Sequence, residues 1–223
     1  MTLLREIQLL LERTYAPIPI NLEACVIGDG RCATLNRLAG EEARHLASGG
    51  RTFLRQVGDS LYVAIFYSRP IIEELEANDP RRALNERNIS AMITFIEEIA
   101  HGVQAAFLFQ QGERQIDSEN YARNLEAQAR VDTYLVLSKF AQGICGGRTP
   151  RKVGHWLREQ LFDTSYHAFT TPQLRARYEV SQKCAIAFLS YLRCVPLSSR
   201  LPILRKFRAL TWGEKLEFVH LSL

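Results

Sequence analysis

Long apolar runs and paired cysteines are both missing from this sequence. No apolar stretch reaches the roughly 18 residues that a membrane-spanning helix needs, and residues 1–15 have charged side chains between their leucines, unlike a signal peptide. The five cysteines are widely spaced and form no CxxC pair, which argues against a disulfide framework or a zinc ribbon. We therefore expect a cytoplasmic protein with no membrane partner.

Charge is unevenly distributed along the chain. The net charge is +4, but residues 1–147 have an excess of acidic side chains and residues 148–223 a larger excess of basic ones. A Gly-Gly-Arg-Thr-Pro stretch at the junction is typical of a boundary. We predict an α+β domain at 1–147 and a basic, all-helical extension at 148–223 packed on it, unless the two form one continuous domain. The basic part could bind an acidic partner or nucleic acid, or its charges could lie on solvated helix faces.

Turn residues and apolar periodicity predict helices around one short hairpin. Residues 51–57 and 60–67 are rich in β-branched and aromatic residues and are joined by Gly58-Asp59, which suits a two-residue type II′ turn. A further strand is expected at 20–27. Helices are expected at 1–15, 33–47, 71–77, 88–110, 119–140, 150–161, 172–194, 199–208 and 212–221. This order predicts the α+β class.

Lysine and arginine are absent from the helix expected at 88–110. Most of this helix is apolar, and its polar sector holds Glu97, Glu98 and His101. Residues three and four apart lie on one face, so His101 neighbours both carboxylates. The sector is either the solvated face of an amphipathic helix or the wall of a cleft, and the lack of Lys and Arg favours a cleft. Such a carboxylate and imidazole could bind one metal ion or form a hydrogen-bonded pair.

A third metal ligand would have to come from another helix. Glu126 is the first candidate, because a turn between the helices at 88–110 and 119–140 would make them antiparallel and bring Glu126 opposite His101. Glu119, seven residues earlier on the same face, is the second candidate. The pattern therefore predicts a site shared by two neighbouring helices.

The EExxH motif at residues 97–101, followed by Glu126-Ala127-Gln128-Ala129, resembles the zincin metallopeptidases. Their active-site helix carries HExxH, and a glutamate in an ExxA segment of a later helix is the third ligand. The resemblance covers residues 51–140. It implies a zincin-like domain with a small sheet containing antiparallel strands and a long active-site helix. The sequence departs from the family at Glu97, which replaces the first histidine, and at Arg130, where an acidic residue often stands.

Carried over residue by residue, the resemblance implies that His101 and Glu126 bind a divalent metal and that Glu98 is the general base. Glu97 would be a further ligand, giving a Glu/His/Glu site. Zinc is the first expectation, and the harder ligand set could favour manganese or iron. His167 could stabilise the transition state, although a structural role is the simpler interpretation. The resemblance thus implies a metal-dependent hydrolase of the zincin peptidase type, acting on a peptide or protein.

Two other interpretations fit the same residues. If Glu97 marks the loss of the metal, the chain is a catalytically inactive zincin-like scaffold, without a cofactor, that binds protein or nucleic acid. The ExxH spacing of residues 98–101 also occurs in ferritin-like di-iron bundles. Those proteins need a second ExxH copy and four bundled helices, and the hairpin argues against them.

Overall fold

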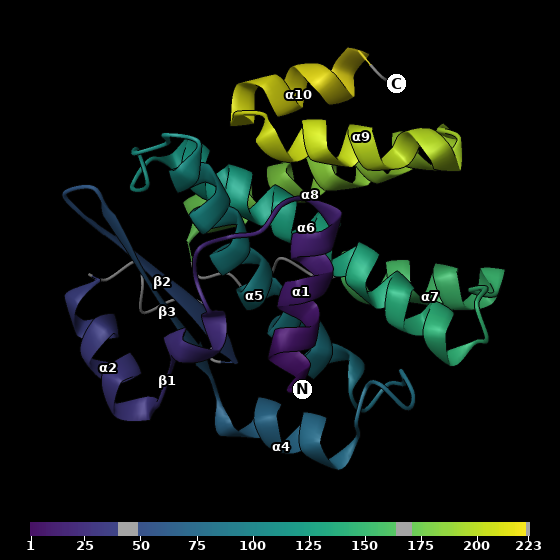
Figure 1. Cartoon of the computed structure of the whole chain (residues 1–223), viewed down its shortest axis with the longest axis horizontal. Coiled ribbons are helices and arrows are strands. Elements are labelled where there is room, and N and C mark those ends of the chain that lie inside the picture. Colours follow the sequence, from purple (N-terminus) through teal and green to yellow (C-terminus); the bar gives the residue numbers. More distant parts are fainter. Residues whose placement is uncertain (40–48, 164–170, 222–223) are drawn as a thin grey trace.

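The computed structural model describes residues 1–39, 49–163 and 171–221, and it has helices packed around a small sheet (Figure 1). The class is α+β, as predicted. In chain order the described elements are α1 (Leu3–Thr14), the 3-10 turn η1 (Leu22–Cys25), β1 (Val26–Ile27), α2 (Asp29–Leu38), β2 (Gly50–Val57), β3 (Ser60–Tyr67), α4 (Arg69–Ala77), α5 (Ile89–Gln110), α6 (Glu119–Ile144), α7 (Arg151–Phe162), α8 (Pro172–Cys194), α9 (Leu197–Ala209) and α10 (Trp212–Leu221).

The sheet has the strand order β1-β3-β2, so that β2 is an outer strand. β2 and β3 form the predicted antiparallel hairpin, with Val57 opposite Ser60. Gly58 has a φ of 57° and Asp59 does not have a positive φ, which is the pattern of a type II′ turn. The strand predicted at 20–27 is wrong over most of its length. The Asn21 side chain caps η1, and only Val26–Ile27 pairs with β3, in the parallel direction.

The helices follow the apolar periodicity of the sequence closely. α8 and α10 have the predicted bounds, and the other predicted helices differ by a few residues at their ends. α6 continues to Ile144 and stops before Gly146 and Gly147, which both have positive φ. The helix predicted at 33–47 begins earlier, at Asp29, and the part predicted at 40–48 lies outside the described residues.

α5 lies between the sheet and α6. Gly102 of α5 packs against Leu22 and Ile65, and the Tyr67 hydroxyl donates a 2.9 Å hydrogen bond to the Phe95 carbonyl. Among the described helices, α5 alone is long and apolar enough to cross a membrane. Most of its residues are buried, as in the core helix of a soluble protein. Glu97, Glu98 and His101 in the middle of α5 consequently face protein more than bulk water, with side chains no more than 21% exposed.

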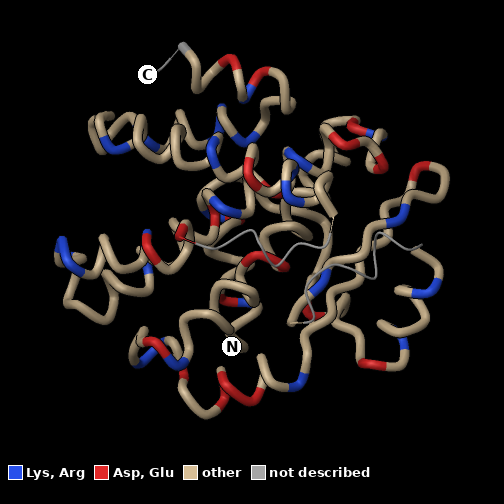
Figure 2. The backbone as a smooth tube through the Cα atoms, turned by 180° about the vertical axis from the view of Figure 1, so that it is seen from behind, with Lys and Arg blue, Asp and Glu red and all other residues tan. Residues whose placement is uncertain are grey.

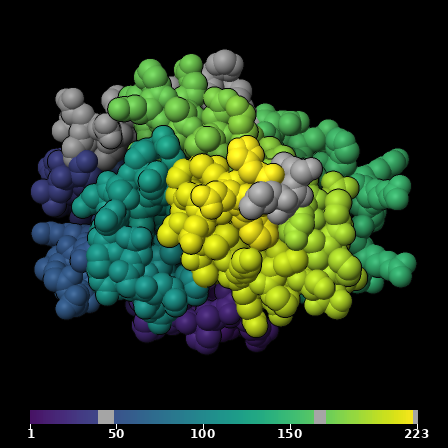
Figure 3. All heavy atoms as spheres, turned by 90° about the horizontal axis from the view of Figure 1, so that it is seen from above, coloured from purple at the N-terminus to yellow at the C-terminus, as the bar shows by residue number. Residues whose placement is uncertain are grey.

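One hydrophobic core contains residues from both halves of the chain. Ile7, Ile99 and Leu137 belong to it, and so do Phe188 and Phe207, whose rings stack 3.7 Å apart. Figure 3 shows α9 and α10 over one face of the molecule, with residues from the middle of the chain around them. Acidic residues gather along α4, whereas basic residues follow α9 (Figure 2).

A buried polar network ties α10 and α9 to α6. Lys215 is fully buried and donates hydrogen bonds of 2.8 Å to Asn124 and 3.0 Å to Gln128. Arg208, also buried, donates to Asp132 over 3.3 Å. Asn124, Gln128 and Asp132 are spaced four apart and therefore form one stripe on α6. The packing of the C-terminal helices consequently depends on polar contacts as well as on apolar ones.

Replacing Lys215 with methionine should change how stability depends on pH. Burial lowers the pKa of Lys215 to about 7, so between pH 7 and 8.5 the unfolded chain binds more protons at this residue than the native chain does. Lys215 therefore makes the free energy of unfolding rise with pH, by up to about 1.4 kcal/mol per unit. We expect Lys215→Met to have a shallower slope than the wild type in urea titrations from pH 7 to 8.5. Equal slopes would contradict a buried, deprotonating Lys215.

Two glycine-to-alanine substitutions should have opposite effects on stability. A Cβ at Gly50 would lie 2.8 Å from Thr94 Cγ2 and 2.9 Å from Glu98 Cγ, so Gly50→Ala should destabilise the protein by about 1–3 kcal/mol. At Gly154, inside α7, no atom lies within 4 Å of an added Cβ. Gly154→Ala should therefore stabilise by about 0.5–1 kcal/mol. Urea denaturation of both variants checks this, and a stable Gly50→Ala would refute the close approach of β2 to α5.

Candidate functional site

Five charged side chains from α5 and α6 meet in the interior of the protein. Glu97, Glu98 and His101 come from α5, and Glu126 and Arg130 come from α6. Their side chains are between 11% and 21% exposed. The structure therefore brings together the carboxylates and the histidine that the sequence pattern singled out.

The two helices run antiparallel, and this direction sets the site's pairings. Glu97 contacts Arg130, His101 contacts Glu126, and Gln104 contacts Asn124, so positions rise along α5 as they fall along α6. The predicted placement of Glu126 opposite His101 is confirmed. The polar sector of α5 faces α6 and β2, because the remainder of the helix surface packs into the core.

His101 lies between two carboxylates. Its Nδ1 is 3.6 Å from Glu98 Oε2, and its Nε2 is 3.5 Å from Glu126 Oε2. Burial lowers the pKa of His101, but the charges of Glu126 and Glu98 outweigh it and hold the pKa well above its usual value. Burial has the opposite effect on Glu126 and raises its pKa. The positive charges of His101 and Arg130 outweigh burial and bring the pKa of Glu126 below its usual value. Without a metal, an imidazolium therefore joins the two helices.

Glu97 is held by Arg130 rather than by His101. Arg130 Nη1 lies 2.7 Å from Glu97 Oε1, a close ion pair without hydrogen-bond geometry. Burial raises the pKa of Glu97, and this effect exceeds the opposing one of Arg130. Glu97 and Arg130, the two residues that depart from the zincin pattern, thus contact each other.

Three residues of the site were not predicted as part of it. The Thr52 hydroxyl, on β2, has one proton to donate, and its oxygen lies 2.6 Å from the Glu98 carboxylate and 3.0 Å from the Glu98 carbonyl. Tyr178, on α8, hydrogen-bonds to Glu126 and lowers the pKa of that carboxyl. Arg130 is spaced four residues from Glu126, which was the only sequence signal for its placement. Thr52 and Tyr178 are too distant in sequence for spacing to reveal them.

The remaining candidate residues lie elsewhere. Glu119 binds Arg177 and Arg123 at the surface, with 2.5 Å to Arg177 Nη2, so it does not reach the cluster. His167 lies outside the described residues. Within the described ranges, no group of three or more His, Cys, Asp or Glu side chains is arranged to hold a metal ion. His101 Nε2 and Glu126 Oε2, which are 3.5 Å apart, are spaced like two ligands of one ion.

Removing Arg130 should destabilise the protein through Glu97. Arg130→Gln leaves a buried carboxylate without its cation and should lower the free energy of unfolding by about 2–4 kcal/mol. Glu97→Gln in the same chain should recover part of this loss, which a double-mutant cycle in urea measures. As a matched control, the exposed pair of Arg69 and Glu73 should give a coupling of about 0–1 kcal/mol. Equal coupling in both cycles would contradict the buried pair.

No known family model matches the chain, and no curated protein or solved structure is significantly similar to it. The likeness to zincins consequently rests on the EExxH and ExxA segments and on where the fold places them.

Proposed function

We propose that the chain is a metal-dependent hydrolase with a zincin-like domain, in which His101 and Glu126 hold a divalent ion and Glu98 is the general base. The meeting of His101 Nε2 and Glu126 Oε2 at 3.5 Å carries the proposal. Two ligands at about 2.0–2.1 Å from a tetrahedral zinc lie about 3.4 Å apart. His101 Nε2 is also buried and makes no hydrogen bond with standard geometry, so that its lone pair is available after deprotonation.

The surroundings of the pair support a zincin-like arrangement. A hairpin precedes α5, and its outer strand β2 lies beside the EExxH segment, with Thr52 bound to Glu98. The ExxA segment stands on the next, antiparallel helix. Glu97 would complete a Glu/His/Glu set only after leaving Arg130. These ligands, two carboxylates and one imidazole, could bind zinc, which is the first expectation, or manganese or iron.

The proposed reaction is hydrolysis of a peptide bond. A divalent ion held by His101 and Glu126 would supply Lewis acidity for the carbonyl and for a water molecule. To act as the base, Glu98 would turn from His101 Nδ1, 3.6 Å from its Oε2, toward the water on the Nε2 side. It would accept a proton from the water as the water oxygen bonds to the carbonyl carbon, and it would give a proton to the amine as the C–N bond breaks. The 2.6 Å hydrogen bond from Thr52 fixes the direction of the Glu98 carboxylate. Arg130 stands beside Glu97, where it limits the negative charge of the site.

A second function is favoured by the ion pairs themselves. Arg130 neutralises Glu97, and a protonated His101 joins Glu98 to Glu126, so the protein's own cations compensate the carboxylates. A site of this kind needs no metal to be stable. The chain would then be an inactive zincin-like scaffold that binds protein or nucleic acid.

Metal analysis separates the two functions. We expect protein purified without chelator or nickel resin to contain stoichiometric zinc, manganese or iron, and His101→Ala and Glu126→Gln to lose it, because each removes a ligand. His220→Ala, which removes an exposed histidine on α10, should retain the metal. Metal-free wild-type protein whose melting temperature is unchanged by added zinc or manganese would contradict the hydrolase and leave the scaffold.

Glu98→Gln tests the general base separately from the ligands. The variant should keep its metal and lose at least about 100-fold in cleavage of an unfolded protein substrate such as casein, because glutamine cannot accept the proton. Thr52→Val should lose less, since Glu98 stays in place without its orienting bond. Full activity in Glu98→Gln would refute its role as base.

A further inference from the structure

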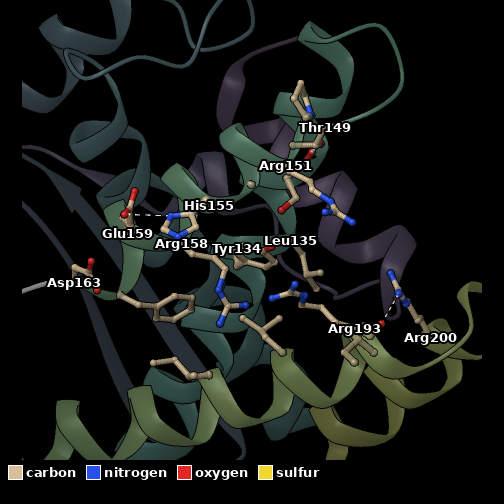
Figure 4. Close-up of a pocket in the computed structure, with 17 residues that line it drawn as sticks. Tyr134, Leu135, Thr149, Arg151, His155, Arg158, Glu159, Asp163, Arg193 and Arg200 are labelled. Carbon is tan, nitrogen blue, oxygen red and sulfur yellow. Dashed lines mark hydrogen bonds and ion pairs between the residues drawn. The ribbon is translucent and has the colours of Figure 1, made fainter.

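A large cavity opens among four helices of the C-terminal part of the chain. Its volume is about 1080 Å³, and it is lined by residues of α6, α7, α8 and α9 (Figure 4). Drug-sized ligands occupy sites of about 300–1,000 Å³, so the cavity is large enough for a small molecule. None of the residues of the EExxH cluster lines it.

Arginine is the dominant charged residue of this cavity. Arg151, Arg158, Arg193 and Arg200 all line it. Arg200 donates to two backbone carbonyls, those of Val195 and Arg193. In the described part of the chain, the other three have no carboxylate partner, and Arg158 Nη1 is buried without a hydrogen bond. Several unpaired guanidinium groups around one space repel one another, and an anion between them would relieve that repulsion.

The acidic residues of the cavity do not balance these charges. Glu159 is paired with His155 at 3.1 Å, which leaves Asp163 as the other carboxylate of the lining. The N-terminus of α7 also lies at the wall, where Pro150 provides no side-chain cap. A helix N-terminus carries a partial positive charge and unpaired N–H groups. The cavity is therefore electropositive from its side chains and its backbone.

The rest of the cavity wall is apolar and partly aromatic. Leu135, Ile186, Leu189 and Leu192 line it, together with the rings of Tyr134 and Phe162. These ring centroids are 6.4 Å apart, and the Arg158 guanidinium is 5.9 Å from the first and 5.8 Å from the second. Figure 4 shows Arg158 beside Tyr134 among the side chains that line the cavity. The site combines a flat cationic group with aromatic and aliphatic surface.

We propose that this cavity binds a nucleoside phosphate. A phosphate monoester has up to two negative charges and three acceptor oxygens, which suits several guanidinium groups better than one carboxylate does. The base would stack on the rings or on the plane of Arg158. The phosphate would lie near Arg193 and Arg151, close to the α7 N-terminus. The ligand is either a free nucleotide or the terminal nucleotide of a single strand, since both present the same chemistry.

Calorimetric titration of the full chain tests this proposal. The probes are AMP, a 5′-phosphorylated hexanucleotide, inorganic phosphate and a hexaglutamate peptide, each at 50 mM and 200 mM salt. We expect AMP or the hexanucleotide to bind more tightly than phosphate or the peptide. Arg158→Gln and Arg193→Gln should each weaken that binding about 10-fold or more. Tighter AMP binding supports a free nucleotide as the source, and tighter hexanucleotide binding supports a strand.

Matched controls separate a site from general charge. The control variants are Arg175→Gln and Lys152→Gln. Arg175 lies on α8 with Arg193, Lys152 lies on α7 with Arg158, and neither residue lines the cavity. Both controls should bind within about 2-fold of the wild type. Equal weakening in controls and cavity variants, phosphate or peptide binding as tight as AMP, or no binding of any probe would overturn the proposal. Far-UV circular dichroism identifies any variant that fails to fold, and Arg158→Lys and Arg193→Lys then replace it.

Discussion

Burial of α5 between the sheet and α6 is the constraint on which the rest of the structure depends. A helix that packs on protein from both sides leaves little solvent to its polar sector, so its carboxylates are stabilised by nearby cations. Arg130 serves Glu97, and His101 serves Glu98 and Glu126. The same burial places Gly50 and Thr52 of β2 against Glu98, and this fixes the distance between sheet and helix.

α6 has two stripes of polar and charged residues, which face different neighbours. Glu126 and Arg130 point toward the EExxH segment, whereas Asn124, Gln128 and Asp132 form a second stripe toward α9 and α10. The two stripes are two residues apart in sequence, which is about half a turn of the helix. α6 therefore connects the candidate site with the C-terminal helices, and the larger hydrophobic cluster of the described residues contains side chains from both halves of the chain.

Seven basic residues of 148–223 lie in three different kinds of surroundings. Arg208 and Lys215 are buried in the second polar stripe of α6. Arg177 binds Glu119 of α6. Arg151, Arg158, Arg193 and Arg200 line the cavity beside α7. Eight of the thirteen Lys and Arg residues of 148–223 are exposed, as expected for solvated surfaces, whereas Arg208 and Lys215 are buried. Basic side chains that look alike in sequence therefore lie in surroundings of very different polarity.

The local features of this protein follow from its residue pattern alone. Apolar periodicity located the long helices, Gly58-Asp59 specified the hairpin turn, and spacings of three and four placed Glu97, Glu98 and His101 on one face. These features depend on contacts between residues close in the chain, which spacing encodes. The 3-10 turn η1 was missed inside the strand predicted at 20–27, where the Asn21 side chain accepts a hydrogen bond from the Glu23 N–H and only Val26–Ile27 is extended in the sheet.

Which charged side chains meet depends on how the helices and strands pack. The pairing of Glu97 with Arg130, the bond from Thr52 to Glu98 and the approach of Tyr178 to Glu126 join elements far apart in sequence. The arginine cavity likewise forms only when four helices pack. A side chain's partner and its desolvation are properties of the packed core, and no spacing along the chain specifies them.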